Sequence, residues 1–160
     1  MEKAVDKIKD LTAAASLVRQ WKENGKRIVF TNGCFDILHL GHVDYLEKAK
    51  SLGDVLVVGL NTDSSVSRFK GPQRPLQDEA SRARIMASLM SVDLVVLFDE
   101  DTPLRLISVL LPHILVKGSD YLAENIVGAD VVQNAGGVVK TIDFVPGYST
   151  TKIVEKIKTT

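Results

Sequence analysis

Short apolar runs rich in β-branched residues alternate along the chain with longer stretches whose apolar residues recur at helical spacing. Two of the short runs, residues 55–58 (VLVV) and 94–97 (LVVL), contain no polar residue. Strands without polar alternation are typical of sheets that are covered on both faces. Their alternation with helices therefore predicts a parallel sheet with right-handed crossovers and helices on both sides.

The same patterns place the individual elements. We expect strands at residues 28–32, 55–60, 93–97, 114–117 and 138–142. We expect helices at residues 12–24, 42–51, 78–90, 102–110, 126–134 and 150–158, with a polar loop at residues 61–76. With the strands in the order 3-2-1-4-5, the first and fourth lie side by side at the switch point, where ligands bind outside the carboxyl ends. The expected fold class is α/β, a Rossmann-like three-layer sandwich with a parallel five-stranded sheet.

Length and composition limit the number of domains and the kinds of partner. The 160 residues suffice for one domain, 1–160, in which residues 1–25 form a helical lead-in. The 20 basic and 20 acidic side chains balance, so no basic field predicts a nucleic-acid partner. The single cysteine, Cys34, and the lack of a membrane-spanning or secretory pattern lead us to expect a cytoplasmic protein with no membrane partner.

The segment 33–42 (GCFDILHLGH) joins the first of these strands to a helix and carries two histidines. His39 and His42 are three apart at the helix start, so both rings lie on one face beside free backbone N–H groups. The helix dipole favours negative charge there, and Gly41 allows a ligand close to the backbone. An isolated pair is more often a core or capping feature, but the preceding strand and turn favour a polyphosphate site. Zinc is disfavoured, because helical zinc ligands are typically four apart with an acidic partner.

Two further residues of this segment have competing interpretations. Asp36 either orients the turn or helps to hold a magnesium-bound phosphate, and the sequence leaves both open. Cys34 is expected to be a small packed residue rather than a nucleophile, since no neighbouring histidine is placed to generate its thiolate.

Polar residues after the second strand are also candidates. Lys70 begins a basic loop and is suited to phosphate as a movable point charge. Asn61 and Asp63 are placed for substrate contact, although helix capping explains them equally well. Arg82 lies near a helix start, where a cation opposes the dipole, and this conflict points to substrate binding unless a nearby carboxylate pairs with it.

Two later loops complete the predicted site. Ser149, Thr150 and Thr151 precede the last helix and predict a second anion site, because one N-cap accounts for only one hydroxyl. The loop 117–121 (KGSDY) follows the fourth strand and should meet the segment 33–42 at the switch point.

In order and spacing these motifs resemble the cytidylyltransferase-like nucleotidyltransferase superfamily from about residue 26 to the C-terminus. Within it, segments 30–36 (FTNGCFD), 99–103 (DEDTP) and 115–121 (LVKGSDY) resemble the adenylyltransferase domain of ADP-heptose synthases. Phe144 stands where glycerol-phosphate cytidylyltransferases carry an arginine, which argues against the cytidylyl branch.

The resemblance implies transfer of AMP from ATP to D-glycero-D-manno-heptose 1-phosphate, with Mg²⁺ held mainly by the phosphates. It implies His39, His42 and Lys70 as catalytic residues and Asp36, Asn61, Asp63 and Arg82 as substrate contacts. The nucleotide-binding residues it implies, besides the two histidines, are Asn32, Gly33, Cys34, Phe35, Asp36, Gly41, Lys117, Gly118, Asp120, Tyr121, Ser149, Thr150 and Thr151. It also implies a homo-oligomer and a separate heptose kinase that supplies the sugar phosphate.

Alternatives remain open at this point. The chain could instead resemble FMN adenylyltransferases or glycerol-3-phosphate cytidylyltransferases in its substrates. A nucleotide-binding regulatory module without catalysis is a further alternative. Whether the product serves lipopolysaccharide or another glycan is also open.

Overall fold

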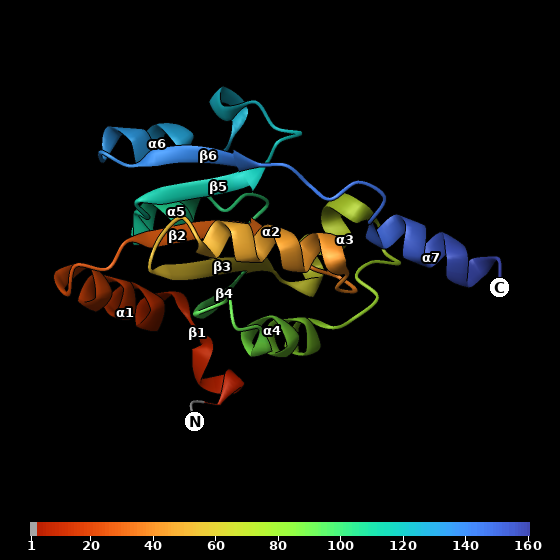
Figure 1. The fold of residues 1–160 in the computed structure, drawn as a ribbon. Helices are drawn as coiled ribbons and strands as arrows, with labels where there is room; N and C mark the ends of the chain where they lie inside the picture. Colours follow the sequence, from red (N-terminus) through yellow and green to blue (C-terminus); the bar gives the residue numbers. More distant parts are fainter. Residues whose placement is uncertain (1–2) are drawn as a thin grey trace.

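A six-stranded parallel sheet forms the centre of the computed structural model, which describes residues 3–160 (Figure 1). The strands are β1 (Ile8–Lys9), β2 (Ile28–Gly33), β3 (Val55–Asn61), β4 (Leu94–Phe98), β5 (Ile114–Gly118) and β6 (Val138–Ile142). The helices are α1 (Leu11–Glu23), α2 (Leu40–Lys50), α3 (Asp63–Lys70), α4 (Glu79–Ser88), α5 (Leu104–Leu110), α6 (Ala129–Asn134) and α7 (Thr150–Lys158). Short 3₁₀ helices occur at Ala4–Lys7 and Ala123–Asn125.

The strand order is β1-β4-β3-β2-β5-β6, and every pairing is parallel. Counted from β2, this confirms the predicted order 3-2-1-4-5 for five strands. The predicted total of five was wrong, because β1 adds a sixth strand at the edge of β4. Its two residues pair as Ile8↔Val95 and Lys9↔Val96, which is too short a run for a periodic signal. Part of the predicted lead-in therefore belongs to the sheet.

The predicted loop at residues 61–76 was wrong in its first half, where α3 forms. The Thr62 hydroxyl accepts a hydrogen bond from the Ser65 N–H and caps this helix. Val66 is its only fully buried apolar residue, so the segment lacks the repeating apolar spacing by which helices are recognised in a sequence.

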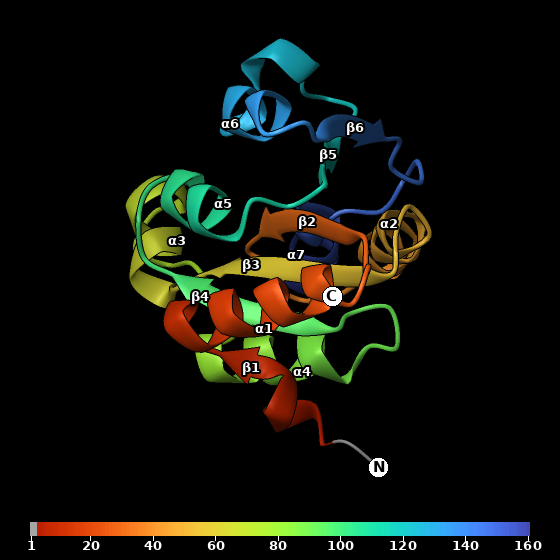
Figure 2. The ribbon, with the colours of Figure 1, turned by 90° about the vertical axis from the view of Figure 1, so that its left-hand side faces the viewer.

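Helices cover both faces of the sheet, as predicted (Figure 2). On one face α1, α5 and α6 pack on alternate strand residues such as Phe30, Val57 and Leu115. On the other face α2 and α4 pack on the intervening residues, such as Leu56 and Val116. Burial on both sides explains why the runs 55–58 in β3 and 94–97 in β4 are continuously apolar.

After β6 the chain leaves the sheet, and α7 projects from the body of the domain (Figure 1). None of its residues is buried. No helix within residues 3–160 combines the length and the apolar character needed to cross a membrane.

Candidate active site

The carboxyl ends of β2, β3 and β5 open into a cleft of about 630 Å³. It lies at the switch point between β2 and β5, where the strand order predicts it. Predicted site residues that line it are Asn32, Gly33, Cys34, Phe35, Asp36, His42, Asn61, Lys70, Lys117, Gly118, Asp120, Tyr121 and Thr150. Predicted residues outside its lining are His39, Gly41, Asp63, Arg82, Ser149 and Thr151.

The two histidines form a stack at the start of α2. His39 is the N-cap residue in extended backbone, and its ring centroid lies 3.8 Å from that of His42. A Cβ on Gly41 would lie 3.0 Å from the His39 ring, so the glycine gives the ring its space. Phe35 contacts His42 edge-on, with 5.3 Å between ring centroids. From the sequence we expected a ligand to use the space beside Gly41. In the structure the imidazole of His39 occupies that space.

Both imidazoles are uncharged at neutral pH. Burial, with smaller contributions from the charges of His39 and Lys70, lowers the pKa of His42 to about 4. Burial also lowers the pKa of His39. The Nδ1 atoms of both rings and Oδ1 of Asn32 are buried without a hydrogen-bond partner within residues 3–160. A buried polar atom without a partner is costly and calls for an explanation, so this end of α2 is a candidate binding site.

The loop between β2 and α2 is strained and is held in place by contacts to a distant loop. Phe35 and Ile37 have positive φ values of 47° and 56°, a conformation that bulky and β-branched residues rarely adopt. The Asp36 carboxylate accepts hydrogen bonds from the N–H groups of Leu76, at 2.7 Å, and Gln77, at 3.0 Å. Of the two interpretations of Asp36, these contacts support the orienting one.

Arg82 lies behind this loop, not in the cleft as its prediction as a substrate contact required. Its buried guanidinium donates to the carbonyl oxygens of Cys34 and Asn61, both at 2.8 Å. It also donates to the carbonyl of Gln77 and pairs with Asp63 at 2.7 Å. A cation near the start of α4 is disfavoured by the helix dipole, but these hydrogen bonds and the ion pair with Asp63 compensate for it.

Asn61 and Cys34 meet at the base of the cleft. The Asn61 amide donates to the Ser65 hydroxyl at 3.0 Å, and Cys34 Sγ lies 3.9 Å from Asn61 Oδ1. Burial raises the pKa of the Cys34 thiol, against the opposing charges of Lys70 and Arg82. A thiol in this state is a packed residue, as predicted, and not a thiolate.

The three hydroxyls before α7 have separate roles in the structure. Ser149 caps the helix by accepting a hydrogen bond from the Lys152 N–H at 3.1 Å. Thr150 donates to the Asp36 carbonyl at 2.8 Å, which ties α7 to the β2–α2 loop. Thr151 is exposed. Two of the three hydroxyls thus already have partners, and only Thr150 reaches the cleft.

Aromatic side chains that the sequence did not single out for the site form part of the cleft wall. Phe144 stacks on Tyr45 with 5.4 Å between centroids, and a Cβ on Gly118 would overlap Phe144. Phe69 also lines the cleft beside Lys70. Helical periodicity marks Tyr45 as a core position only, and its contact with Phe144 depends on the tertiary fold.

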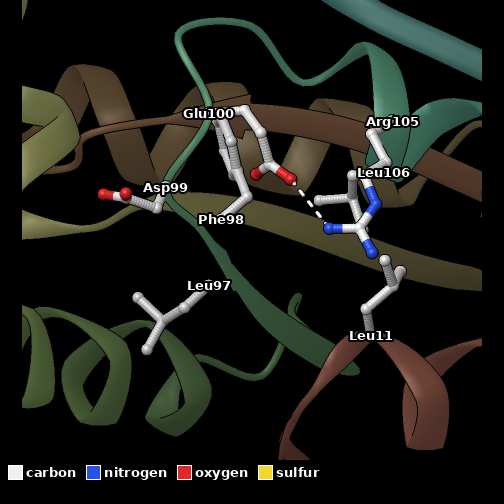
Figure 3. A pocket seen from close by; sticks show the side chains of 7 residues that line it. All are labelled: Leu11, Leu97, Phe98, Asp99, Glu100, Arg105 and Leu106. Carbon is white, nitrogen blue, oxygen red and sulfur yellow. Dashed lines mark hydrogen bonds and ion pairs between the residues drawn. The ribbon is translucent and has the colours of Figure 1, made fainter.

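A second hollow of about 410 Å³ lies at the carboxyl end of β4, near α1 and α5 (Figure 3). Arg105 and Glu100 pair across it at 3.1 Å. None of the predicted site residues lines it. The larger cleft is therefore the candidate active site.

A doubly wound parallel sheet with this cleft at its switch point defines an α/β protein whose candidate ligand site lies outside the carboxyl ends of its strands. Residues 30–156 match the family model described as cytidylyltransferase-like, and the chain belongs to this family of nucleotidyltransferases. The prediction from the motifs is confirmed.

Two curated relatives extend the comparison. The bifunctional protein HldE of Geotalea uraniireducens is 61% identical over 153 residues, which are 96% of this chain and 31% of that protein. The protein of the same name from Geobacter metallireducens is 61% identical over 151 residues, which are 94% of this chain and 31% of that protein. The chain thus spans about a third of the length of these relatives.

Two solved structures are similar as well. The lipopolysaccharide core biosynthesis protein from Thermoplasma volcanium is 34% identical with a TM-score of 0.60, over 76% of this chain and 98% of that one. Pantoate-beta-alanine ligase from Francisella tularensis, complexed with beta-gamma ATP and beta-alanine, is 16% identical with a TM-score of 0.62. That match covers 94% of this chain and 76% of the ligase, and it concerns the fold alone.

Proposed function

We propose that the chain transfers the adenylyl group of ATP to D-glycero-D-manno-heptose 1-phosphate, giving ADP-heptose and pyrophosphate. Family membership supports the reaction class. The motifs shared with ADP-heptose synthases and the 61% identity to two proteins named HldE support the base and the sugar. The name of the Thermoplasma volcanium relative supports a product used in lipopolysaccharide core synthesis.

The observation that carries the proposal is the stacked pair of neutral imidazoles at the start of α2, of which His42 lines the cleft. We assign this corner to the phosphates of ATP. Lys70 lines the same cleft, and its charge contributes to the lowered pKa of His42. Thr150, at the start of α7, also lines this cleft. Free N–H groups at the starts of α2 and α7 add to the attraction for an anion.

The chemistry requires alignment more than proton transfer. An oxygen of the sugar phosphate attacks the α-phosphorus of ATP, and the bond to the bridging oxygen breaks as pyrophosphate leaves with the electron pair. The attacking phosphate is already anionic, so no residue has to remove a proton. His39 and His42 then act by hydrogen bonding to phosphate oxygens, and His42 is assigned as the main transition-state donor.

We assign the nucleoside to the wall of the cleft formed by the end of β5. Gly118, Asp120 and Tyr121 line this wall beside Phe144. The backbone of residues 32–35 forms the floor between it and the histidines.

Magnesium would enter with ATP and would neutralise part of the charge of its phosphates. Asp36 has both carboxylate oxygens hydrogen-bonded to backbone N–H groups, which makes it a poor metal ligand. We therefore assign the ion to the substrate phosphates.

Pyrophosphate release across a substrate panel tests the proposal. ATP and CTP are each combined with heptose 1-phosphate, glycerol 3-phosphate and FMN, and turnover is expected for ATP with heptose 1-phosphate. Turnover with FMN or with CTP and glycerol 3-phosphate would support those alternatives. ATP binding without turnover on any acceptor would indicate a regulatory module.

His42→Ala is the matched variant for this panel. Loss of one preorganised donor costs about 2.7–4 kcal/mol, so turnover should fall by roughly two to three orders of magnitude with the fold retained. Near-normal pyrophosphate release by the folded variant would contradict the role of His42.

Three further points belong to the proposal. A heptose kinase outside these 160 residues supplies the sugar phosphate, and the reaction takes place in the cytoplasm, where ATP is available. The protein forms a homo-oligomer, which the exposure of Leu40, Leu76 and Tyr148 near the cleft supports. Sedimentation of the purified protein measures its oligomeric state.

A further inference from the structure

The cleft contains two lysines, and its proposed substrates carry two anionic groups. Lys70 and Lys117 are the only basic side chains, histidine aside, among the residues that line it within 3–160. Arg82, the other cation predicted for the substrate, is fully engaged behind the cleft. ATP and a sugar phosphate both have to be held by what remains.

Lys117 is held without an anionic partner. Within residues 3–160 its ammonium makes no hydrogen bond and no ion pair, and it lies 5.3 Å from the centre of the Tyr121 ring. Burial lowers the pKa of Lys117, and the nearby Asp120 carboxylate acts against that shift without contacting it. A partly desolvated cation of this kind regains favourable interactions when an anion binds.

The two lysines belong to segments on opposite sides of β2: α3, which ends at Lys70, follows β3, and Lys117 lies on β5. Both line the same cleft as Cys34. Only Lys70 acts on His42. Lys70, at the end of α3, therefore belongs with the imidazole pair, whereas Lys117, on β5, lies on the far side of the β2 terminus.

In-line displacement uses this separation. The attacking and leaving oxygens lie on opposite sides of the α-phosphorus. Pyrophosphate leaves toward His42 and Lys70 under the proposed function, so the acceptor has to approach from the other side. We propose that Lys117 binds the phosphate group of the acceptor, a role distinct from the nucleotide contact that the motif resemblance implies for it. This assignment rests on the proposed function.

The test compares three charge-removing variants. Lys117→Gln and Lys70→Gln change the cleft, and Lys140→Gln removes an equal charge from an exposed position on the neighbouring β6, outside the cleft. Pyrophosphate release is measured while ATP and heptose 1-phosphate are varied in turn. Calorimetric titration of heptose 1-phosphate onto protein saturated with α,β-methylene-ATP measures acceptor binding without turnover.

Lys117→Gln is expected to raise the KM and the Kd for heptose 1-phosphate about 10- to 100-fold, the effect of one charged hydrogen bond, with the KM for ATP within about twofold. Lys70→Gln should raise the KM for ATP and leave the KM for heptose 1-phosphate within about twofold. Lys140→Gln should change neither KM. Lys117→Arg keeps the charge and should recover most of the acceptor binding.

Other outcomes overturn the assignment. An unchanged acceptor KM in Lys117→Gln, a raised KM for ATP, or a lower kcat with both KM values unchanged would each contradict it. If the wild-type protein does not use heptose 1-phosphate, the proposed function fails, and Lys117 is tested with whichever phosphate acceptor the panel supports. If no acceptor reacts, both proposals fall.

Discussion

His42 is the residue at which burial and chemistry conflict most directly. Its ring packs between Phe35 and His39, and this burial keeps it neutral. A neutral imidazole can still donate one hydrogen bond to a phosphate oxygen, but it carries no charge of its own. The binding of a polyanion would favour its protonated form, so the site can gain a charge only when ATP is present.

The same burial makes folding stability depend on pH. In the unfolded chain His42 has its ordinary pKa near 6.5, whereas in the folded protein the pKa is about 4. Between these values the unfolded state binds the proton, so the stability is complete above about pH 6.5 and is lost as pH falls toward 4. At pH 5 we expect a loss on the order of 1–2 kcal/mol from this residue, discounted for its partial exposure.

Urea unfolding at pH 7.5 and pH 5.0 measures this effect. His42→Gln is the matched variant, because it keeps a polar side chain but does not titrate. His39 and His113, whose pKa values are also lowered, still contribute in both proteins. The wild-type protein should therefore lose more stability than the variant, and equal losses would show that the ring of His42 is solvated.

At the scale of elements, α4 holds the loop that forms the floor of the cleft. Arg82 connects α4 to the ends of β2 and β3 through the carbonyls of Cys34 and Asn61. The strained backbone of Phe35 and Ile37 lies in the same loop. Such a conformation persists only where surrounding contacts fix it, so Arg82 is a positioning residue for the site.

Arg82→Met should reduce the stability of the protein strongly. The change leaves the carbonyl oxygens of Cys34, Asn61 and Gln77 without their donor, and a buried acceptor left unpaired typically costs about 1–3 kcal/mol. Asp63 also loses its partner, but its side chain is partly exposed and stays solvated. Arg84→Met is the control, because Arg84 is exposed on the same helix and should change stability by less than about 0.5 kcal/mol. Chemical denaturation measures both, and similar losses would contradict the positioning role.

The elements also show what the sequence can and cannot predict. Short apolar runs rich in β-branched residues identify the five longer strands, and the turn before His39 identifies the candidate binding loop. The interactions of Arg82 were not predictable, since its partner Cys34 is 48 positions away and no local pattern links them. The two-residue strand β1 and the polar helix α3 carry too few buried residues for periodicity to detect.

At the scale of the whole molecule, the cleft joins segments from almost the full length of the chain. Its lining runs from Asn32 at the end of β2 to Thr150 at the start of α7. The hydrogen bond from Thr150 to the Asp36 carbonyl connects residues 114 positions apart. A ligand in the cleft therefore contacts segments that are far apart in the sequence, and its binding should stabilise the domain as one unit.

ATP is accordingly expected to raise the stability of the entire domain in a single transition. A ligand that binds only the folded state adds about 2.7 kcal/mol at one hundred times its Kd, and about 1.4 kcal/mol more for each further tenfold in concentration. Urea unfolding followed by both tryptophan fluorescence and circular dichroism, at increasing concentrations of MgATP, measures this gain. Trp21 lies in α1, remote from the cleft lining, and reports on the opposite side of the fold. If its transition does not shift with ATP while the circular dichroism signal does, the chain unfolds in parts and the cleft stabilises only the elements around it.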